Sequence, residues 1–417
     1  MCTIEKITII GLGYVGFPLA VQAASRGFTV CGYDVNQSTV DAVNNKTHFL
    51  HDSFVRERIE HIEIKAATEL LSSDVYIVCV PTPVTNFSDP DFTFVREAVE
   101  SIAGIIEDGQ LVVIESTINP GVSEDLVAPI LDKSGKRYYL AHCPERINPG
   151  DPKWTVANIP RVVGGIDAES TRRAAGLYQK LIEAEVTELS QIAAAESTKI
   201  LENTFRDVNI AFVNEMAQSF YKLGIDIAEV IRGAATKPFG FMPHYPGIGV
   251  GGHCIAVDPY YMIQRGKQVG FDHIFLKQAR KINSEMPEFA VRVLQDGLNQ
   301  HYLPLKGTVI AVLGLSYKPD IADDRESPAY ELIKLLTMKG PKLHIYDPYV
   351  PEKSNVGSLE AALAESKAAV LVTAHSEFLD ESLYLKQKVI LDGRNCLDKR
   401  KFSETNGPSY LGIGIRR

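Results

Sequence analysis

Short apolar runs alternate with helix-like segments through the first third of the chain. Residues 7–10, 29–33, 75–80 and 111–114 are mostly apolar and rich in β-branched side chains. Runs of this kind are buried on both faces, as in a parallel sheet that helices cover. Residues 18–26, between the first two runs, have helical periodicity. The pattern predicts a doubly wound α/β domain.

A different pattern covers residues 193–224. Apolar and small side chains recur there at helical spacing, and no strand-like run interrupts them. A helix of about 30 residues would be about 45 Å long, which exceeds the width of a small domain. We therefore expect this helix to link domains and to carry a subunit contact. The helical pattern resumes at residues 275–299.

The last third of the chain has a second α/β pattern. A helix is expected over residues 329–339, with Gly340 as its C-terminal stop. The strand-like runs are residues 309–315, 343–346, 369–372 and 389–392. The expected fold class is therefore α/β, with two Rossmann-like doubly wound domains joined by a long central helical region. The expected divisions are residues 1–192, 193–302 and 303–417.

Composition narrows the class of protein. The net charge of −9 disfavours nucleic acid and anionic membranes as partners. No apolar run approaches the roughly 20 residues of a transmembrane helix, and the N-terminus has no signal-peptide pattern. The six cysteines lie far apart, with neither a Cys-x-x-Cys pair nor a zinc-finger spacing. We expect a cytoplasmic protein without a metal site or a structural disulfide.

A glycine-rich turn directly follows the first predicted strand. Its first glycine permits a tight turn, its second lets the backbone approach a pyrophosphate, and its third lets helix and strand pack closely. About twenty residues on, Asp34 ends the second predicted strand. A carboxylate there accepts hydrogen bonds from the adenosine ribose and repels a 2′-phosphate, which favours NAD over NADP. The candidates at this cofactor site are Gly11, Gly13, Tyr14, Val15, Gly16 and Asp34.

A second glycine-rich loop lies far along the chain. Residues 247–252 contain four glycines, which excludes a helix and makes a poor strand. Such a loop can bring several backbone N–H groups close to a ligand. Cys254 ends the loop, and Asp258 follows four residues later. A thiol delivered in this way is a candidate nucleophile, with a buried structural cysteine as the alternative.

Polar residues elsewhere suggest partners for this thiol. Lys199 and Asn203 are four apart on the predicted long helix, so they share one face. Both side chains can donate hydrogen bonds to a developing oxyanion, with a solvated helix face as the alternative. Thr117 and Glu145 follow predicted strands at the carboxyl edge, where open α/β sheets bind ligands. Glu145 can serve as a general base, although a turn or cap role is as plausible for either residue.

At these residues the sequence resembles the UDP-glucose/GDP-mannose dehydrogenase family almost from end to end. The similar motifs, in the family's order, are residues 11–16, 80–83, 115–117, 144–146, 214–215, 251–254 and 324–328. The resemblance implies a dinucleotide-binding domain, a central helical dimerisation region that forms a homodimer, and a C-terminal domain that binds a UDP-sugar. It also implies NAD as the cofactor.

The resemblance implies a role for each matched residue. Cys254 would attack the aldehyde that the first hydride transfer forms, and Lys199 and Asn203 would stabilise the resulting oxyanions. Glu145 would position water or act as base in thioester hydrolysis. The residues that would help to hold that water are Thr117 and Asp258. The remaining cofactor-binding candidates are Pro81, Thr82, Thr117 and Arg325, and the substrate-binding candidates are Glu145, Arg146, Lys199, Asn203, Tyr245, Gly247, Gly251 and Lys318.

One departure from the family pattern bears on the substrate. Members that act on UDP-glucose usually carry Pro-Lys-Asp after the cysteine, whereas this chain has Ala-Val-Asp at residues 256–258. Together with His253 and residues 237–241, this resembles the branch that acts on UDP-N-acetylhexosamines. The expected reaction is a four-electron oxidation of the C6 alcohol through a Cys254 thioester, with UDP-N-acetylglucosamine as substrate. UDP-N-acetylmannosamine, UDP-N-acetylgalactosamine and UDP-glucose are alternatives.

Two further hypotheses assign the protein to a different functional class. A two-electron β-hydroxyacid dehydrogenase would explain Lys199 and Asn203, but it would need no cysteine and no second α/β domain. A catalytically silent regulator that binds NAD or a nucleotide sugar would have no need of Cys254 or Lys199, and both are present.

Overall fold

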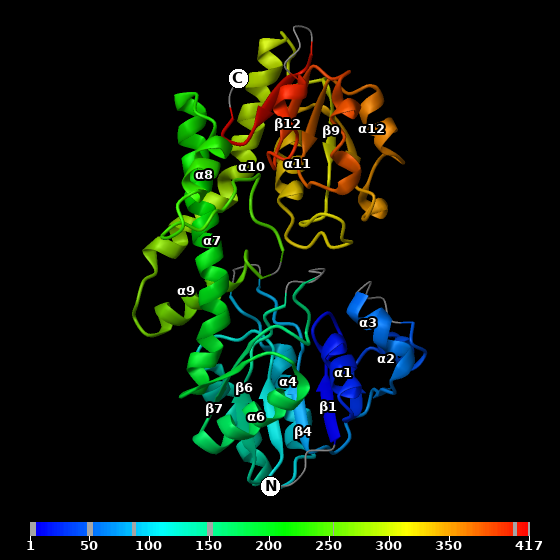
Figure 1. Ribbon diagram of the computed structural model, residues 1–417, viewed down its shortest axis with the longest axis vertical. Helices are drawn as coiled ribbons and strands as arrows, with labels where there is room; N and C mark the ends of the chain where they lie inside the picture. Colours follow the sequence, from blue (N-terminus) through cyan, green and yellow to red (C-terminus); the bar gives the residue numbers. More distant parts are fainter. Residues whose placement is uncertain are drawn as a thin grey trace. The chain divides into compact units, whose positions relative to one another are not determined.

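The computed structural model describes residues 6–47, 53–85, 89–147, 153–252, 254–402 and 407–415. The chain forms two compact units, each built around one sheet (Figure 1). The N-terminal unit comprises Met1–Glu202 and Tyr260–Phe271, and the C-terminal unit comprises Asn203–Pro259 and Asp272–Arg417.

The N-terminal unit contains an eight-stranded sheet in the order β3-β2-β1-β4-β5-β6-β7-β8. All neighbouring strands are parallel except β6 and β7, which are antiparallel. The strands are β1 (Lys6–Ile10), β2 (Thr29–Tyr33), β3 (Lys65–Ala67), β4 (Val75–Val78), β5 (Leu111–Ile114), β6 (Tyr139–His142), β7 (Arg161–Gly165) and β8 (Val186–Leu189).

Helices cover both faces of this sheet. Leu111 and Val113 of β5 belong to one hydrophobic cluster, whereas Val112 and Ile114 belong to a second. Successive side chains of a strand point to opposite faces, so each cluster fills one face. The helices of the unit are α1 (Gly16–Ser25), α2 (Gln37–Asn44), α3 (Ser53–Arg58), α4 (Thr93–Ala103), α5 (Ala128–Leu131), α6 (Ala168–Leu181) and most of α9 (Asp258–Gln268).

The C-terminal unit contains a five-stranded parallel sheet in the order β10-β9-β11-β12-β13. The strands are β9 (Val309–Leu313), β10 (Lys342–Tyr346), β11 (Ala368–Leu371), β12 (Val389–Asp392) and β13 (Ser409–Gly412). The helices are α8 (Ile227–Ala235), α10 (Ile274–Gln300), α11 (Pro328–Lys339) and α12 (Leu359–Ala364). The long helix α7 (Ile192–Leu223) begins in the N-terminal unit and continues into this one.

The predicted fold class of two Rossmann-like sheets with a helical region between them in sequence is confirmed. The helix expected at residues 193–224 is α7, and the one expected at 275–299 is α10, which continues through Pro287. The pattern did not indicate the antiparallel pairing of β6 with β7. The three-part domain division proposed from the sequence stays a prediction.

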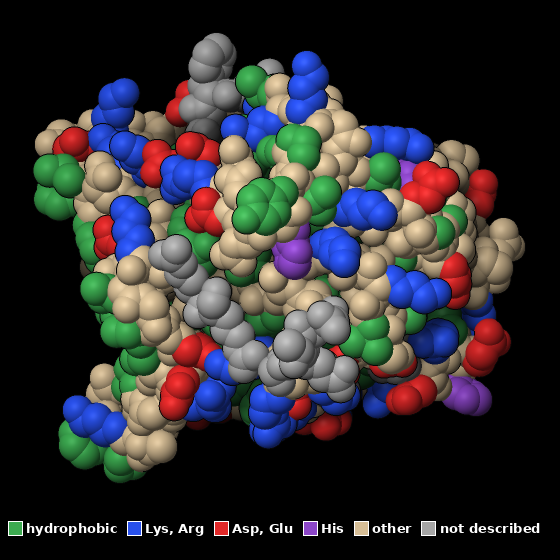
Figure 2. Space-filling model, turned by 90° about the horizontal axis from the view of Figure 1, so that it is seen from above, with side chains coloured by type: hydrophobic (Ala, Val, Ile, Leu, Met, Phe, Trp, Pro, Cys, Tyr) green, Lys and Arg blue, Asp and Glu red, His purple; other side chains and the backbone are tan. Residues whose placement is uncertain are grey.

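Charged side chains of both signs occur on the face of the molecule drawn in Figure 2. On the face drawn in Figure 2, Lys and Arg side chains are interspersed with Asp and Glu, without an extended area of either sign. Among the described residues, none of the helices combines the length and the apolar character that a membrane span requires. The same residues contain no cluster of His, Cys, Asp and Glu suited to a metal ion.

Candidate active site

The geometry of the turn after β1 shows why glycine occupies each of three positions. Gly11 has a φ of 88°, and a Cβ there would lie 2.9 Å from the carbonyl oxygen of Cys79. A Cβ on Gly16 would lie 1.9 Å from the carbonyl oxygen of Gly11, so α1 packs directly on the turn. A Cβ on Gly13 would meet nothing within 4 Å. Two glycines therefore allow close packing, and the third leaves open space that fits the approach of a pyrophosphate.

Asp34 links this turn to the end of β2. Its Oδ2 accepts the backbone N–H of Leu12 at 2.9 Å, and its Oδ1 accepts the N–H of Asn36 at 2.9 Å. Tyr14, in the turn itself, is 42% exposed. The carboxylate is thus fixed beside the glycine turn, where it fits the adenosine ribose of a dinucleotide.

Two loops at the carboxyl edge of the same sheet contact each other. Ser116 follows β5, and its hydroxyl donates to the carbonyl of Val80 at 2.7 Å. Tyr261 of α9 donates its hydroxyl to the carbonyl of Thr82. Thr117 is partly exposed beside them, and Pro81 is exposed. These contacts fix both loops at the edge where open α/β sheets bind ligands.

A buried carboxylate on α7 holds the loop that follows Thr117. Glu196 accepts the backbone N–H groups of Gly121 at 2.5 Å and Ser123 at 2.9 Å. Burial raises the pKa of Glu196 to about 7, although these hydrogen bonds oppose the shift. Glu196 precedes Lys199 by about one turn of α7. The loop after Thr117 is therefore hydrogen-bonded to the part of α7 that carries Lys199.

Glu145 is buried with both carboxylate oxygens hydrogen-bonded. Its Oε1 accepts the N–H groups of Arg146 at 2.6 Å and Ile147 at 2.8 Å. Its Oε2 accepts from Nη2 of Arg161 at 2.7 Å. The Arg146 side chain turns elsewhere and pairs with Glu202 at 2.5 Å. Glu145 is therefore an oriented carboxylate, as a water-positioning base requires.

The charge of Lys199 acts on buried groups that follow β5 and β6. The lysine is half-buried on α7. Burial and the Lys199 ammonium together lower the pKa of His142 to about 3. Burial raises the pKa of Glu115, and the same ammonium opposes that rise. The N-terminal unit thus places a lysine close to the buried acidic groups that follow β5 and β6.

The C-terminal unit brings Cys254, Asp258 and Asn203 together. The carbonyl of Cys254 accepts the N–H of Asp258 at 2.8 Å, in the turn that starts α9. The Asp258 carboxylate, 3% exposed, accepts from Nδ2 of Asn203 at 2.5 Å. The amide that α7 contributes is therefore fixed beside the cysteine loop. His253 lies outside the described residues.

The glycine-rich loop packs directly on the segment after β9. A Cβ on Gly249 would lie 3.0 Å from Pro328, and one on Gly251 would lie 2.9 Å from both Pro328 and Tyr317. A Cβ on Gly252, which has a φ of 82°, would lie 2.9 Å from the Tyr317 ring. Any side chain at these positions would force the loop away from this segment.

The same segment carries two of the residues expected to bind ligands. The carbonyl of Arg325 accepts the N–H of Gly252 at 3.1 Å, and the Arg325 guanidinium pairs with Asp323 at 2.5 Å. Lys318 is half-buried, whereas Tyr245, at the start of the loop, is 62% exposed.

A buried polar network holds the start of the loop. Asn214 accepts the N–H of Gly247 at 3.0 Å and donates to Asn283 at 2.9 Å. Asn283 donates to Asp207 at 2.8 Å, and Arg280 donates to the same carboxylate oxygen at 2.5 Å. The network thus connects α7 and α10 to the loop. Its only sequence signal was Asn214, in the motif at residues 214–215.

Arg394 is a candidate that the sequence analysis missed. Its Nε donates to the carbonyl of Val372 at 2.9 Å, and a Cβ on Gly247 would lie 3.0 Å from its Nη1. Burial lowers the pKa of Arg394. A guanidinium at the carboxyl end of β12, beside the glycine-rich loop, suits a diphosphate. Its position directly after a predicted strand was the signal that could have identified it.

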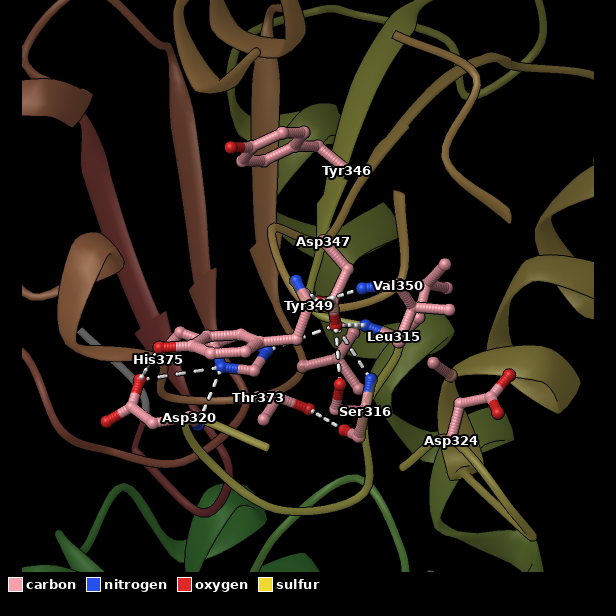
Figure 3. Close-up of polar contacts among 12 residues, drawn as sticks. Leu315, Ser316, Asp320, Asp324, Tyr346, Asp347, Tyr349, Val350, Thr373 and His375 are labelled. Atoms are coloured by element: carbon pink, nitrogen blue, oxygen red, sulfur yellow. Dashed lines mark hydrogen bonds and ion pairs between the residues drawn. The ribbon is translucent and has the colours of Figure 1, made fainter. Parts of the chain in front are cut away.

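The turn after β9 repeats that of the cofactor site. Gly314 has a φ of 96°, and its N–H donates to the carbonyl of Tyr346 at 2.9 Å. Asp347 accepts the N–H of Leu315 at 2.6 Å, and Figure 3 shows its carboxylate surrounded by polar groups. Nε2 of His375 lies 3.0 Å from Asp347 Oδ2. In this domain the carboxylate is sealed inside the protein.

Three models of one family match the chain in order. They are the NAD binding domain at residues 5–182, the central domain at residues 193–285 and the UDP binding domain at residues 311–399 of the UDP-glucose/GDP-mannose dehydrogenase family. The chain belongs to the UDP-glucose/GDP-mannose dehydrogenase family. This family member is accordingly an NAD-dependent nucleotide-sugar dehydrogenase, and NAD is its cofactor.

Relatives of this dehydrogenase span nearly its whole length. The UDP-N-acetyl-D-mannosamine dehydrogenase of Pyrococcus horikoshii is 35% identical, with 98% of this chain and 99% of the relative covered. A solved structure of UDP-D-ManNAc dehydrogenase from the same organism has a TM-score of 0.91 at 34% identity, covering 98% of this chain and 99% of that one. The UDP-N-acetyl-D-glucosamine 6-dehydrogenase of Pseudomonas aeruginosa is 33% identical, with 95% and 98% covered.

Proposed function

We propose that this dehydrogenase oxidises the C6 alcohol of a UDP-N-acetylhexosamine to the carboxylate, through a thioester on Cys254. The observation that carries the proposal is the set of Cys254, Asp258 and Asn203 at the end of the glycine-rich loop. Asp258 contacts the Cys254 carbonyl through its N–H and the Asn203 amide through its carboxylate, so one residue joins the cysteine's loop to an amide donor. A thiol and an amide donor are the two groups that covalent capture of an aldehyde needs. The names of the relatives in Pyrococcus horikoshii and Pseudomonas aeruginosa support the acetamido sugar.

The residues divide the chemistry in the following way. A first hydride leaves C6 as the hydroxyl proton is released, which gives an aldehyde. The Cys254 thiolate bonds to the aldehyde carbon and forms a tetrahedral oxyanion, which Lys199 and Asn203 stabilise through hydrogen bonds. Loss of a second hydride from C6 gives the thioester. Water then attacks the thioester carbon, its proton passes to Glu145, and the C–S bond breaks to release the uronic acid and the Cys254 thiolate. Bound NAD⁺ supplies the hydride acceptor for each two-electron oxidation.

Two further groups of residues bind the ligands. Thr117 and Asp258 help to hold the water for hydrolysis. Residues 11–16, with Asp34, Pro81, Thr82 and Arg325, hold the cofactor. The loop at residues 245–252 holds the nucleotide sugar together with Arg146, Lys318 and Arg394, whose charges suit a diphosphate.

Two candidate substrates differ in the configuration at C2 of the sugar. UDP-N-acetylglucosamine is the substrate that the sequence analysis favours. UDP-N-acetylmannosamine is the alternative, because the relatives carrying that name are 32–35% identical to this chain over nearly its full length. Comparison of kcat/KM for the two sugars tests which one the site prefers.

We also propose that two copies of the chain form a homodimer through the central helices. Phe205 and Phe212 are 49% and 54% exposed and lie two turns apart on α7, hence on one face. Met242, in the segment that follows α8, is 62% exposed. Two phenylalanines exposed on one helix face support an interaction surface there.

The thiol's role is tested by substitution. The Cys254→Ser variant should lose net turnover to the uronic acid by several orders of magnitude, because a hydroxyl is a far weaker nucleophile without a strong base. Cys396→Ser is the matched control, since Cys396 is also a free cysteine and serine retains a donor for Asp392. Full activity of Cys254→Ser would refute the thioester route.

A further inference from the structure

A buried arginine lies between two carboxylates in the N-terminal unit. Arg161, at the start of β7, has no exposed surface. Its Nη2 donates to Glu145 Oε2 at 2.7 Å, and its Nη1 lies 3.7 Å from Glu115 Oε2. Glu115 and Glu145 are 1% and 3% exposed. Three ionisable groups are therefore held together with almost no surface exposed to bulk solvent.

The charge of this cluster does not balance if all three groups are ionised. One guanidinium and two carboxylates leave a net negative charge among the buried groups. Lys199, which is only half-buried, offsets that charge in part, and the uncompensated remainder is costly. A retained proton removes that charge. The 2.7 Å contact is a charge-assisted hydrogen bond, whereas the 3.7 Å separation is too long for one. Arg161 is therefore paired with Glu145, and the proton is kept on Glu115.

The surroundings of Glu115 agree with this assignment. Tyr178 of α6 is fully buried and donates its hydroxyl to Glu115 Oε1. Burial raises the pKa of Glu115 to about 7. Arg161, Tyr178 and Lys199 of α7 oppose this shift, whereas Glu145 adds to it. Within the part of the chain that the structure describes, the buried thiols of Cys79 and Cys143 also face Glu115.

We propose that Glu115 is a positioning residue that sets the proton affinity of Glu145 through Arg161. While Glu115 is neutral, the guanidinium charge acts on Glu145 alone and makes it a weak base. When Glu115 is ionised, the two carboxylates share that charge, and Glu145 becomes a stronger base. The inference rests on the proposed role of Glu145 in taking a proton from the water that cleaves the thioester.

The test is the pH dependence of kcat for uronic acid formation in the wild type and two variants. In the wild type, kcat should rise several-fold as the pH passes about 7. Glu115→Gln keeps the shape but stays neutral, so this rise should disappear and kcat should remain at the wild-type low-pH value. Tyr178→Phe removes a hydrogen bond that favours ionised Glu115, so the rise should move to higher pH.

Control variants and outcomes separate this role from a structural one. Tyr138→Phe removes a hydroxyl that bonds Asp132, outside the cluster, and should leave the profile unchanged. A wild type without the rise, or a Glu115→Gln variant that retains it, would overturn the proposal. If Glu115→Gln does not fold, an unshifted Tyr178→Phe profile would overturn it equally. A folded wild type that forms no uronic acid would refute the proposed function instead.

Discussion

Asp34 and Asp347 hold the same position in the two Rossmann-like domains. Each follows the second strand of its sheet and accepts the N–H of the leucine after a positive-φ glycine, at 2.9 Å from Leu12 and 2.6 Å from Leu315. Asp347 is fully buried and is also bonded to His375, whereas Asp34 is partly exposed. Asp34 is therefore accessible to a ribose, whereas the Asp347 carboxylate is used in hydrogen bonds that stabilise the turn after β9.

This difference predicts different results for the same substitution. Asp34→Asn should raise the KM for NAD⁺ by roughly 10- to 100-fold, since a hydrogen bond to a charged group is worth about 1.5–3 kcal/mol. It should also weaken the discrimination against NADP⁺, because the repulsion of a 2′-phosphate is removed. Steady-state kinetics with both cofactors provide the measurement.

Asp347→Asn is the comparison for that experiment. Hydrogen bonds from His375 and the Ser316 backbone outweigh the effect of burial and keep the pKa of Asp347 below its usual value. The substitution should therefore lower the melting temperature and leave the KM for NAD⁺ unchanged. A large rise in that KM would contradict the separation of roles.

The network behind the glycine-rich loop predicts a defect in substrate binding. Asn214→Ala leaves the N–H of Gly247 without its acceptor and Asn283 without its donor. The KM for the UDP-sugar should rise by about tenfold, while the Kd for NAD⁺ should not change. Asn209→Ala is the matched control on α7, because the Asn209 amide donates to the Phe205 carbonyl of its own helix. Equal effects of both variants would argue against the network's role.

Glu196 predicts a pH-dependent stability. Its pKa is raised from 4.5 to about 7 by burial, so the folded protein keeps a proton that the unfolded chain loses across this window. The free energy of unfolding should therefore fall as the pH rises through it, by up to about 3 kcal/mol. Glu196→Gln should reduce this slope, and the part that buried Glu115 contributes should remain. Parallel wild-type and variant curves of melting temperature against pH would contradict the assignment.

The proposed dimer predicts an effect of charge on the exposed face of α7. Phe212→Asp should shift the molecule from dimer to monomer in sedimentation equilibrium, because a buried unpaired charge opposes association. Lys222→Asp, on the same helix and also exposed, is the control and should remain dimeric. A wild type that sediments as a monomer would refute the dimer.

The sequence was most informative where the required pattern is local. The strands at residues 29–33, 111–114 and 389–392 were predicted with their observed bounds, because continuous apolar runs between turn residues require only burial. The glycine turn at residues 11–16 was equally clear, since a Cβ at Gly11 or Gly16 would collide with nearby backbone.

The remaining features depend on contacts between distant parts of the chain. Arg161 lies 16 residues from Glu145 and more than 40 from Glu115, and nothing in its local sequence distinguishes a buried arginine from a solvated one. The edge strand β8 is largely exposed and lacks the apolar run that identifies buried strands. Arg394 gains its significance only from its packing against Gly247.

The proposed reaction is a four-electron oxidation that passes through a thioester on Cys254. The most direct test is the number of NADH molecules formed for each UDP-N-acetylhexosamine consumed, at limiting sugar, with the product identified by mass spectrometry. We expect two NADH and a uronic acid for each sugar. One NADH and an aldehyde would show that oxidation stops after the first hydride transfer, and would contradict the role of Cys254.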